Sequence, residues 1–188
     1  MAEIDRLEWE GKGDALVEWN ARVAARLRER VRGGRFTHAG LQEAFARLRG
    51  GSRSFDALDV LVSGLLDAGP VPEPTLALGP ELVPFQPTPA RVVMDLVELL
   101  RPDDVLVDLG SGLGRVPILA SLLTGCRARG IEREPAFCAY ADRSAAGLGV
   151  AVSSVAADAR EAALDDATCV FLFTPFRGSV LAAVLERI

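Results

Sequence analysis

The sequence contains little of several residue types that common catalytic sites use. It has one histidine, His38, and one lysine, Lys12, among its 188 residues. Ser-His-Asp hydrolases need a histidine beside the nucleophile, and many place the serine in a G-x-S-x-G turn, which is missing here. Phosphate-binding loops of the G-x-x-x-x-G-K-[S/T] type need a lysine that no glycine-rich stretch supplies. Both classes are therefore disfavoured, and His38 is interpreted as a packed or exposed residue of a predicted N-terminal helix.

Cysteine is also scarce. Cys126, Cys138 and Cys169 are odd in number and widely spaced, without a C-x-x-C pair or a zinc-ligand pattern. We expect buried thiols, no metal site and a reducing, cytoplasmic setting. No apolar run reaches the ~18 residues of a membrane span, and the N-terminus lacks the basic and apolar regions of a signal peptide. We therefore expect no membrane association.

The charge is unevenly distributed along the chain. The net charge is −5, but residues 22–53 carry nine arginines against Glu29 and Glu43, whereas residues 54–188 carry 10 basic and 18 acidic residues. Arginines of this kind usually coat solvated helix faces. A docking surface for an acidic partner or nucleic acid is the alternative, which the lack of an aromatic platform or a known nucleic-acid motif disfavours.

Three segments follow from the residue patterns. Residues 1–69 have helical periodicity, residues 70–87 are proline-rich and extended, and residues 88–188 alternate between strands and helices. The proline-rich segment is either a linker or a segment that runs over a cofactor site. The predicted helices before the first strand are Ala15–Val31, Thr37 (as cap) to about Arg49, Phe55–Ala68 with Ser54 as cap, and one that runs to about Leu100 with Thr88 as N-cap and Pro89 as its first residue.

The last segment predicts a parallel α/β sheet. Its expected strands are Val105–Leu109, Arg127–Glu132, Val150–Ala156 and Cys169–Phe173. The near-continuous apolar run of the fourth strand is typical of strands buried on both faces. A final helix is expected from Gly178 to Ile188.

An acid and three alternate glycines follow the first predicted strand. The stretch 105–115, Val-Leu-Val-Asp-Leu-Gly-Ser-Gly-Leu-Gly-Arg, places Asp108 in the strand end and Gly110, Gly112 and Gly114 behind it. Glycine adopts left-handed angles and lets the backbone approach a ligand closely. Amides at the start of a helix lack internal partners and attract anions. The stretch therefore predicts a ligand-binding turn between a strand and a helix.

The glycine spacing resembles motif I, D-x-G-x-G-x-G, of the class I S-adenosylmethionine (SAM) methyltransferases. Dinucleotide folds instead use G-x-G-x-x-G, and this chain has Arg115 at the third glycine position, which disfavours a nicotinamide-dependent oxidoreductase. The resemblance implies SAM as the cofactor and a Rossmann-like sheet of at least four parallel strands in the order 3-2-1-4. Residues 1–69 would then form an N-terminal helical cap on the SAM-binding core 88–188.

Further residues are expected to contact SAM. The amides of the loop 110–114, which includes Ser111, would bind the methionine carboxylate, while Asp108 would attract the ammonium group. Glu132 ends the second strand, where an acid can accept hydrogen bonds from both ribose hydroxyls. Asp158 follows the third strand; by resemblance it lies against the adenine amino group, and it is also placed to cap the segment at residues 160–163.

The stretch after the fourth strand resembles motif IV of N-methyltransferases, usually [Asp/Asn]-Pro-Pro-[Tyr/Phe]. In this chain it is Thr174-Pro175-Phe176, which are the candidate catalytic residues. Thr174 replaces the carboxylate or amide of the family pattern; a threonine accepts a hydrogen bond but is no strong base. Phe176 either packs on the acceptor, as in the family, or belongs to the core.

The resemblance extends upstream of motif I. The stretch from Pro87-Thr88-Pro89 to the glycine loop resembles single-domain protein-lysine methyltransferases, including those that modify an ATP synthase c subunit, and Asp-Leu-Gly-Ser-Gly also resembles the non-SET histone-lysine methyltransferases. In such enzymes the segment before the first helix lies over the methionine end of SAM, so Gln86 and Thr88 become candidate site residues. The expected acceptor is a protein amine such as lysine, or a small molecule.

The class normally has three more strands after the fourth, and this sequence ends at Ile188. We therefore expect the C-terminal strands to be missing, with the fourth strand as an open edge that a second copy of the chain could cover. The alternative to an active enzyme is a SAM-binding or interaction module without catalysis.

Overall fold

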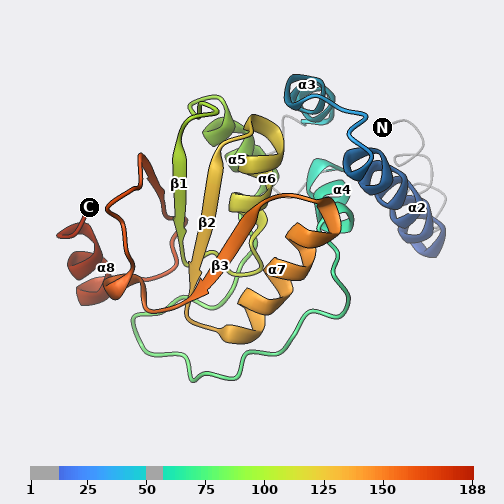
Figure 1. Ribbon diagram of the computed structural model, residues 1–188. Coiled ribbons are helices and arrows are strands. Elements are labelled where there is room, and N and C mark those ends of the chain that lie inside the picture. The colour runs from blue at the N-terminus through green and yellow to red at the C-terminus, as the bar shows by residue number, and fades with distance from the viewer. Residues whose placement is uncertain (1–12, 50–56) are drawn as a thin grey trace.

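The protein is built on a four-stranded parallel sheet. The computed structural model describes residues 13–49 and 57–188, and its strands lie in the order β3-β2-β1-β4 (Figure 1). This confirms the predicted α/β class, strand order and Rossmann-like arrangement. The strands are β1 (Val105–Leu109), β2 (Arg127–Glu132), β3 (Val152–Ala156) and β4 (Cys169–Phe171).

Helices cover the two faces of the sheet unequally. One face carries α5, α6 and α7, with α2, α3 and α4 beyond them, and the other face carries α8 (Figure 1). A short 3-10 turn, η1, contacts α8 on that second face. The bounds are α2 (Gly13–Arg32), α3 (His38–Leu48), α4 (Ala57–Leu65), α5 (Ala90–Val97), α6 (Arg115–Thr124), α7 (Pro135–Leu148), η1 (Ala159–Glu161) and α8 (Gly178–Leu185).

The alternation of side chains along β1 divides the core into two clusters. Leu106 packs with the residues of the helix-rich face, whereas Val107 and Leu109 pack with the residues under α8. All five residues of β1 are buried, as expected for the central strand of a parallel sheet. The outer strands β3 and β4 are only partly buried. Covering of the β4 edge by a second copy stays a prediction.

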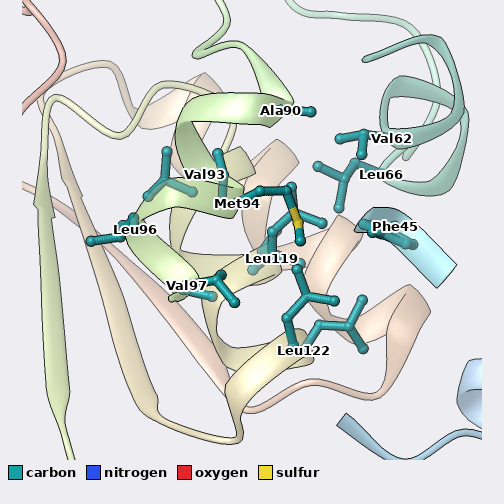
Figure 2. Close-up of a cluster of buried hydrophobic side chains, with 14 of the residues drawn as sticks. Phe45, Val62, Leu66, Ala90, Val93, Met94, Leu96, Val97, Leu119 and Leu122 are labelled. Atoms are coloured by element: carbon teal, nitrogen blue, oxygen red, sulfur yellow. The ribbon is translucent and has the colours of Figure 1, made fainter. Parts of the chain in front are cut away.

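The larger cluster joins the N-terminal helices to the sheet-bearing part of the chain. Figure 2 shows Phe45 of α3, Val62 of α4, Val93 of α5 and Leu119 of α6 pointing toward one another. Each of these four side chains is almost fully buried. The predicted helical cap therefore shares a hydrophobic core with the predicted SAM-binding region, and the boundaries 1–69, 70–87 and 88–188 stay a prediction about the organisation of the chain.

Of the three predicted helix caps, two lie within the described residues, and one of these is correct. Thr37 caps α3, since its Oγ1 accepts a hydrogen bond from the Gly40 amide at 3.1 Å. Thr88 does not cap α5: Pro89 is the N-cap residue and supplies no side-chain bond. The Ala90 amide instead donates to Asp59 Oδ1 of α4 at 2.7 Å. A carboxylate from another helix thus replaces the local cap. The third predicted cap, Ser54, lies outside the described residues.

Element ends differ from the predictions by a few residues. Strand β3 begins at Val152 rather than Val150, and β4 ends at Phe171 rather than Phe173. The chain turns at Thr174, whose φ of 52° cannot continue a strand. Helices α5 and α8 end at Val97 and Leu185, each three residues before the predicted end.

The proline-rich segment 70–87, here called the strap, crosses the carboxyl ends of the strands (Figure 1). Near its start, the Thr75 amide and hydroxyl and the Leu76 amide donate to the carboxylate of Glu134 at 2.7–2.9 Å. Near its end, Val83 donates its amide to Pro175 O at 3.0 Å, and Glu81 accepts hydrogen bonds from Ser179 at the start of α8. The strap is therefore fixed at both sides of the sheet edge.

Replacing Glu134 with alanine should free the first part of the strap. The Thr75 and Leu76 amides lose a charged acceptor, so we expect their hydrogen exchange to become faster by roughly tenfold or more, while amides of β1 stay protected. Hydrogen exchange with mass spectrometry measures both. The exposed Glu73 supplies the control, Glu73→Ala, which removes the same charge within the strap. Unchanged exchange at residues 75 and 76 would contradict this account of how the strap is held.

Candidate active site

A cleft of about 530 Å³ lies between the strap and the loops that follow the four strands. This is the edge where parallel α/β sheets bind ligands, because the strand ends and the following turns converge there. The predicted site residues lie together in it, with Gly114 the exception. Those that line the cleft are Asp108, Gly110, Ser111, Gly112, Glu132, Asp158, Gln86, Thr88, Thr174, Pro175 and Phe176.

The glycine loop has the conformation that its sequence requires. Gly110 and Gly112 have φ values of 79° and 53°, a left-handed region that other residues rarely adopt. Space is also limited there. A Cβ atom on Gly112 would lie 2.5 Å from the Phe85 ring, and one on Gly110 would lie 2.2 Å from Pro175 Cβ. Gly114 turns away from the cleft, toward Ala141 of α7.

The loop amides are occupied, contrary to the expectation that they are free. The Gly110 and Ser111 amides donate to Ile131 O at 2.8 and 3.1 Å, and the Gly114 amide donates to Ser111 O at 2.9 Å. The Gly112 amide donates to Glu132 Oε2 at 3.0 Å. The prediction of unpaired amides is therefore wrong for these four residues. The end of β2 instead holds the loop in shape before a ligand arrives.

Glu132 keeps hydrogen-bonding capacity for a ligand. Its Oε2 accepts the Gly112 amide, and its Oε1 accepts the Glu134 amide at 2.9 Å. A carboxylate offers about four acceptor positions, so both oxygens can accept a further bond. The two backbone bonds fix the orientation of the carboxylate beside the cleft.

Asp108 is the most perturbed acid of the cleft. Its side chain is buried, at 3% exposed, and Asp108 pairs in register with Gly130 of β2, so that Glu132 lies two residues further along the same face. Burial, followed by the charge of Glu132, raises the pKa of Asp108 to about 8. A cationic ligand group beside Asp108 would reverse this shift.

A second polar group in the cleft lacks a partner. The Ser111 hydroxyl is buried, and no residue of the described parts of the chain accepts or donates a hydrogen bond there. Its Oγ lies over Gly130, where a Cβ atom would come within 2.3 Å. A buried hydroxyl without a partner costs free energy. The buried carboxyl of Asp108, which lines the cleft, makes this part of it suited to a positively charged ligand.

Asp158 has the capping role that was predicted as one of its two functions. It is the N-cap of η1, and its Oδ1 accepts the Arg160 amide at 2.9 Å. The Arg160 guanidinium also binds the carboxylate, with 2.7 Å between Nη2 and Oδ2. The hydrogen bonds from Arg160 lower the pKa of Asp158. The contact with an adenine amino group stays a prediction.

The motif after β4 divides between the cleft and the core. Thr174 is exposed, with a left-handed φ of 52°. Pro175 packs on Gly110 and accepts the Val83 amide. Phe176 is buried in the smaller cluster, as the core alternative for this residue predicted. The exposed aromatic side chain of this motif is that of Phe173 instead.

The strap supplies a ring that the sequence analysis missed. Phe85 lies over Gly112 and packs edge-on against Phe137 of α7, with 5.4 Å between ring centroids. Gln86, next to it, is exposed in the cleft, while Thr88 is buried and its carbonyl accepts a hydrogen bond from Arg115 Nη1 at 3.2 Å. The presence of Phe85 in a proline-rich segment could have indicated that this segment packs against the core instead of serving as a linker.

The single histidine, His38, for which no catalytic role was predicted, lies away from the cleft. Its Nδ1 lies 2.9 Å from Leu122 O, near the end of α6. Within residues 13–49 and 57–188, no cluster of three or more histidine, cysteine, aspartate or glutamate residues is arranged to hold a metal ion. No helix in these ranges combines the length and apolar character that crossing a membrane requires.

Comparisons with known proteins found similarities to methyltransferases. A family model described as "Histone methylation protein DOT1" matches residues 86–160. No curated protein matches the chain. Among solved structures, the chain is similar to an RNA methyltransferase from Salinibacter ruber in complex with S-adenosyl-L-homocysteine, with 42% identity, covering 46% of this chain and 60% of that chain, at a TM-score of 0.45.

Two further solved structures are SAM-dependent methyltransferases in complex with S-adenosyl-L-homocysteine. The one from Thiobacillus denitrificans is 23% identical and the one from Geobacter sulfurreducens is 25% identical. Each similarity covers 53% of this chain and 43% of that chain, at a TM-score of 0.45. The chain thus spans less than two thirds of the length of each of these three proteins.

The strand order and the acid-glycine loop at the end of the central strand agree with the predicted Rossmann-like methyltransferase fold. The family model covers residues 86–160, so the activity of the whole protein is a proposal.

Asp108→Asn should stabilise the ligand-free protein in a pH-dependent manner. The group titrates near 3.8 when unfolded and near 8 when folded, so between these values the folded state binds a proton that the unfolded state has lost. The free energy of unfolding then falls with rising pH, by up to about 1.4 kcal/mol per pH unit from this group. Asparagine removes the effect, so the Tm advantage of the variant should grow from pH 4 to about pH 8 and then level off.

Thermal unfolding at several pH values measures this difference. The control is Asp103→Asn, which removes one charge from an exposed residue near the start of β1. A Tm difference between Asp108→Asn and the unchanged protein that stays constant with pH would show that burial does not perturb Asp108.

Proposed function

We propose that the protein transfers the methyl group of SAM to an amine of a protein substrate, with lysine as the acceptor side chain. The observation that carries the proposal is the buried carboxyl of Asp108, which faces the cleft beside the glycine loop and a hydroxyl without a partner. SAM has both an ammonium group and a sulfonium, so its charge suits an acidic cleft of this kind.

The residues present fit the cofactor. Asp108 would hold the ammonium group of the methionine part, and Glu132 would accept hydrogen bonds from the ribose hydroxyls with its remaining acceptor positions. Asp158 would lie at the adenine end, with Arg160 fixing its carboxylate. Gln86, in the strap, and Thr88, which follows it, would lie over the methionine part. SAM supplies an electrophilic methyl group that needs positioning more than activation.

The acceptor half of the cleft is mainly apolar. Phe85, Phe173 and Pro175 line it, from the strap and the loop after β4. Such walls exclude water and favour the neutral form of an amine, whose lone pair is needed for attack. As the new N–CH₃ bond forms, the S–CH₃ bond breaks and S-adenosylhomocysteine leaves. The methylated ammonium then loses its proton to solvent when the product leaves the cleft, because the hydroxyl of Thr174 is too weak a base to take it.

A protein acceptor is favoured over nucleic acid by two observations. The family model that matches residues 86–160 is a histone methylation family, and several arginines of residues 22–53 are engaged within the protein. Arg28 donates to the carbonyls of Gly64 and Leu65, Arg30 stacks on Phe36, and Arg49 pairs with Glu98. These guanidinium groups serve the helical cap and leave a weaker basic surface than the sequence suggested.

Two substitutions should weaken SAM binding without unfolding the protein. Gly112→Val adds a side chain at a left-handed position, against the Phe85 ring, and should abolish binding. Glu132→Ala removes the acceptor of the ribose hydroxyls and should cost about 1.5–3 kcal/mol of binding free energy, roughly a 10- to 150-fold rise in Kd.

Isothermal titration calorimetry with SAM measures these losses, and circular dichroism checks the fold. Gly147→Val is the matched control for the glycine, since a Cβ atom there meets nothing within 4 Å. Glu186→Ala is the control for the acid, because Glu186 is exposed outside the cleft. Binding of SAM by Gly112→Val with unchanged affinity would refute the assignment of the loop.

An assay of methyl transfer tests which class of molecule is the acceptor. The protein is incubated with SAM labelled in its methyl group and with a cell extract, and the labelled fractions are separated into protein, RNA and small molecules. We expect label in protein, on lysine residues by mass spectrometry, and none with Gly112→Val. Label in RNA or in small molecules alone would overturn the choice of acceptor while leaving methyl transfer in place.

A SAM-binding module without catalysis is the second candidate. It is favoured by Thr174, which stands where the family pattern has a carboxylate or amide, in a strained backbone conformation. The methyl-transfer assay distinguishes an active enzyme from a module that binds SAM without catalysis. Tight SAM binding without transfer to any fraction would support the module.

A further inference from the structure

Arg115 is a buried charge at the first residue of α6, directly behind the glycine loop. Its side chain is about nine-tenths buried. One nitrogen, Nη1, donates to Asp59 Oδ1 at 2.8 Å and to Thr88 O at 3.2 Å. The other, Nη2, donates to Ser63 Oγ at 2.7 Å. A single guanidinium thus contacts α4 twice and the residue that follows the strap once.

Asp59 completes the connection from the other side. It is 1% exposed, and the same Oδ1 that accepts Arg115 also accepts the Ala90 amide, the first of α5. Pro89 offers no side-chain cap to that helix, so Asp59 serves as its acid at the N-terminus. The ion pair therefore joins α4, the end of the strap, the start of α5 and the start of α6.

Stability alone does not explain a charge pair in this position. Buried ion pairs lose hydration on both partners, and replacing both with apolar side chains of similar size is often neutral or stabilising. Apolar residues next to the pair in the chain or bonded to it, Leu58, Ala90 and Val116, belong to the larger hydrophobic cluster. Apolar residues could not reproduce the directional hydrogen bonds of the pair. The guanidinium has donors at fixed angles, and it donates to Asp59, Ser63 and Thr88 at the same time.

The position of the pair relates it to the cleft. Arg115 and Thr88 both line the cleft, and Arg115 immediately follows Gly114 in the chain. The Arg115 side chain therefore connects the helix that begins at the glycine loop to Thr88, the residue that follows the strap. The glycine loop and the end of the strap are the two segments expected to lie on opposite sides of the methionine part of SAM.

We propose that Asp59 and Arg115 are positioning residues for the methyl donor: they hold the glycine loop and residues 86–88 at the spacing that SAM needs, and so make helix α4 part of the cofactor site. The proposal rests on the proposed function. It assigns to the N-terminal helices a role in cofactor binding, in addition to their part in the hydrophobic core.

The test is a double variant that removes the charges and keeps the packing. In Asp59→Leu/Arg115→Met, apolar groups of similar size replace the pair, so we expect a Tm within a few degrees of the unchanged protein. SAM affinity, measured by titration calorimetry, should nevertheless fall at least about tenfold, because the directional contacts to Thr88 and Ser63 are lost. The matched control is Asp166→Leu/Arg129→Met, which removes an ion pair of 2.7 Å outside the cleft and should leave the affinity unchanged.

A conservative variant keeps the proposal testable if the double variant does not fold. Arg115→Lys retains the charge beside Asp59 but cannot reach three acceptors at fixed angles. We expect it to keep its fold and to bind SAM several-fold more weakly. Unchanged SAM affinity in a folded double variant, or in Arg115→Lys, would overturn the proposal. Absence of SAM binding in the unchanged protein would instead refute the proposed function itself.

Discussion

The parallel register between β1 and β2 is the constraint on which the rest of the site depends. It places Asp108 beside Gly130 and brings Glu132 to the sheet edge on the same face. The carbonyl of Ile131 then accepts the amides of both Gly110 and Ser111. Two neighbouring strands thereby shape the glycine loop without help from a ligand. They also bury Asp108 beside Glu132, and this burial, followed by the charge of Glu132, raises the pKa of Asp108.

This arrangement stores an unfavourable interaction that a ligand can relieve. A buried carboxyl next to a second acid is costly in a protein without a nearby cation, and the unpaired hydroxyl of Ser111 adds to that cost. Polar groups held in this manner are characteristic of binding sites, which trade stability for affinity. The strap has the complementary role, because it places Phe85 over the glycine loop and lines the cleft.

Local patterns predicted the sheet and its strands well. The limits of β1 and β2 agree with the prediction. The apolar run of β1 ends at the glycine loop, and β2 lies between Gly125, which ends α6, and Pro135, which begins α7. The cap at Thr37 also agrees with the prediction, since it depends on neighbours three residues away. Most predicted site residues meet in one cleft because parallel strands end at the same edge of a sheet.

Contacts between distant segments could not be predicted. Asp59 replaces Thr88 as the cap of α5 across 31 residues, and Arg115, which appeared only as a departure from a dinucleotide motif, bonds to α4. The loop amides appeared free because the sequence does not show that Ile131 and Glu132 would reach them. Each of these errors concerns a hydrogen bond whose partner comes from another element, and periodicity carries no information about such partners.

Proton release on SAM binding tests the central claim most directly. Calorimetric titrations of the protein with SAM at pH 7, in buffers of different ionisation enthalpy, give the number of protons exchanged. Asp108 is mostly protonated at this pH, with a pKa of about 8, so an ammonium group bound beside it should release close to one proton per SAM bound. Asp108→Asn should release none. Binding of SAM without proton release from the unchanged protein would contradict the placement of the cofactor beside Asp108.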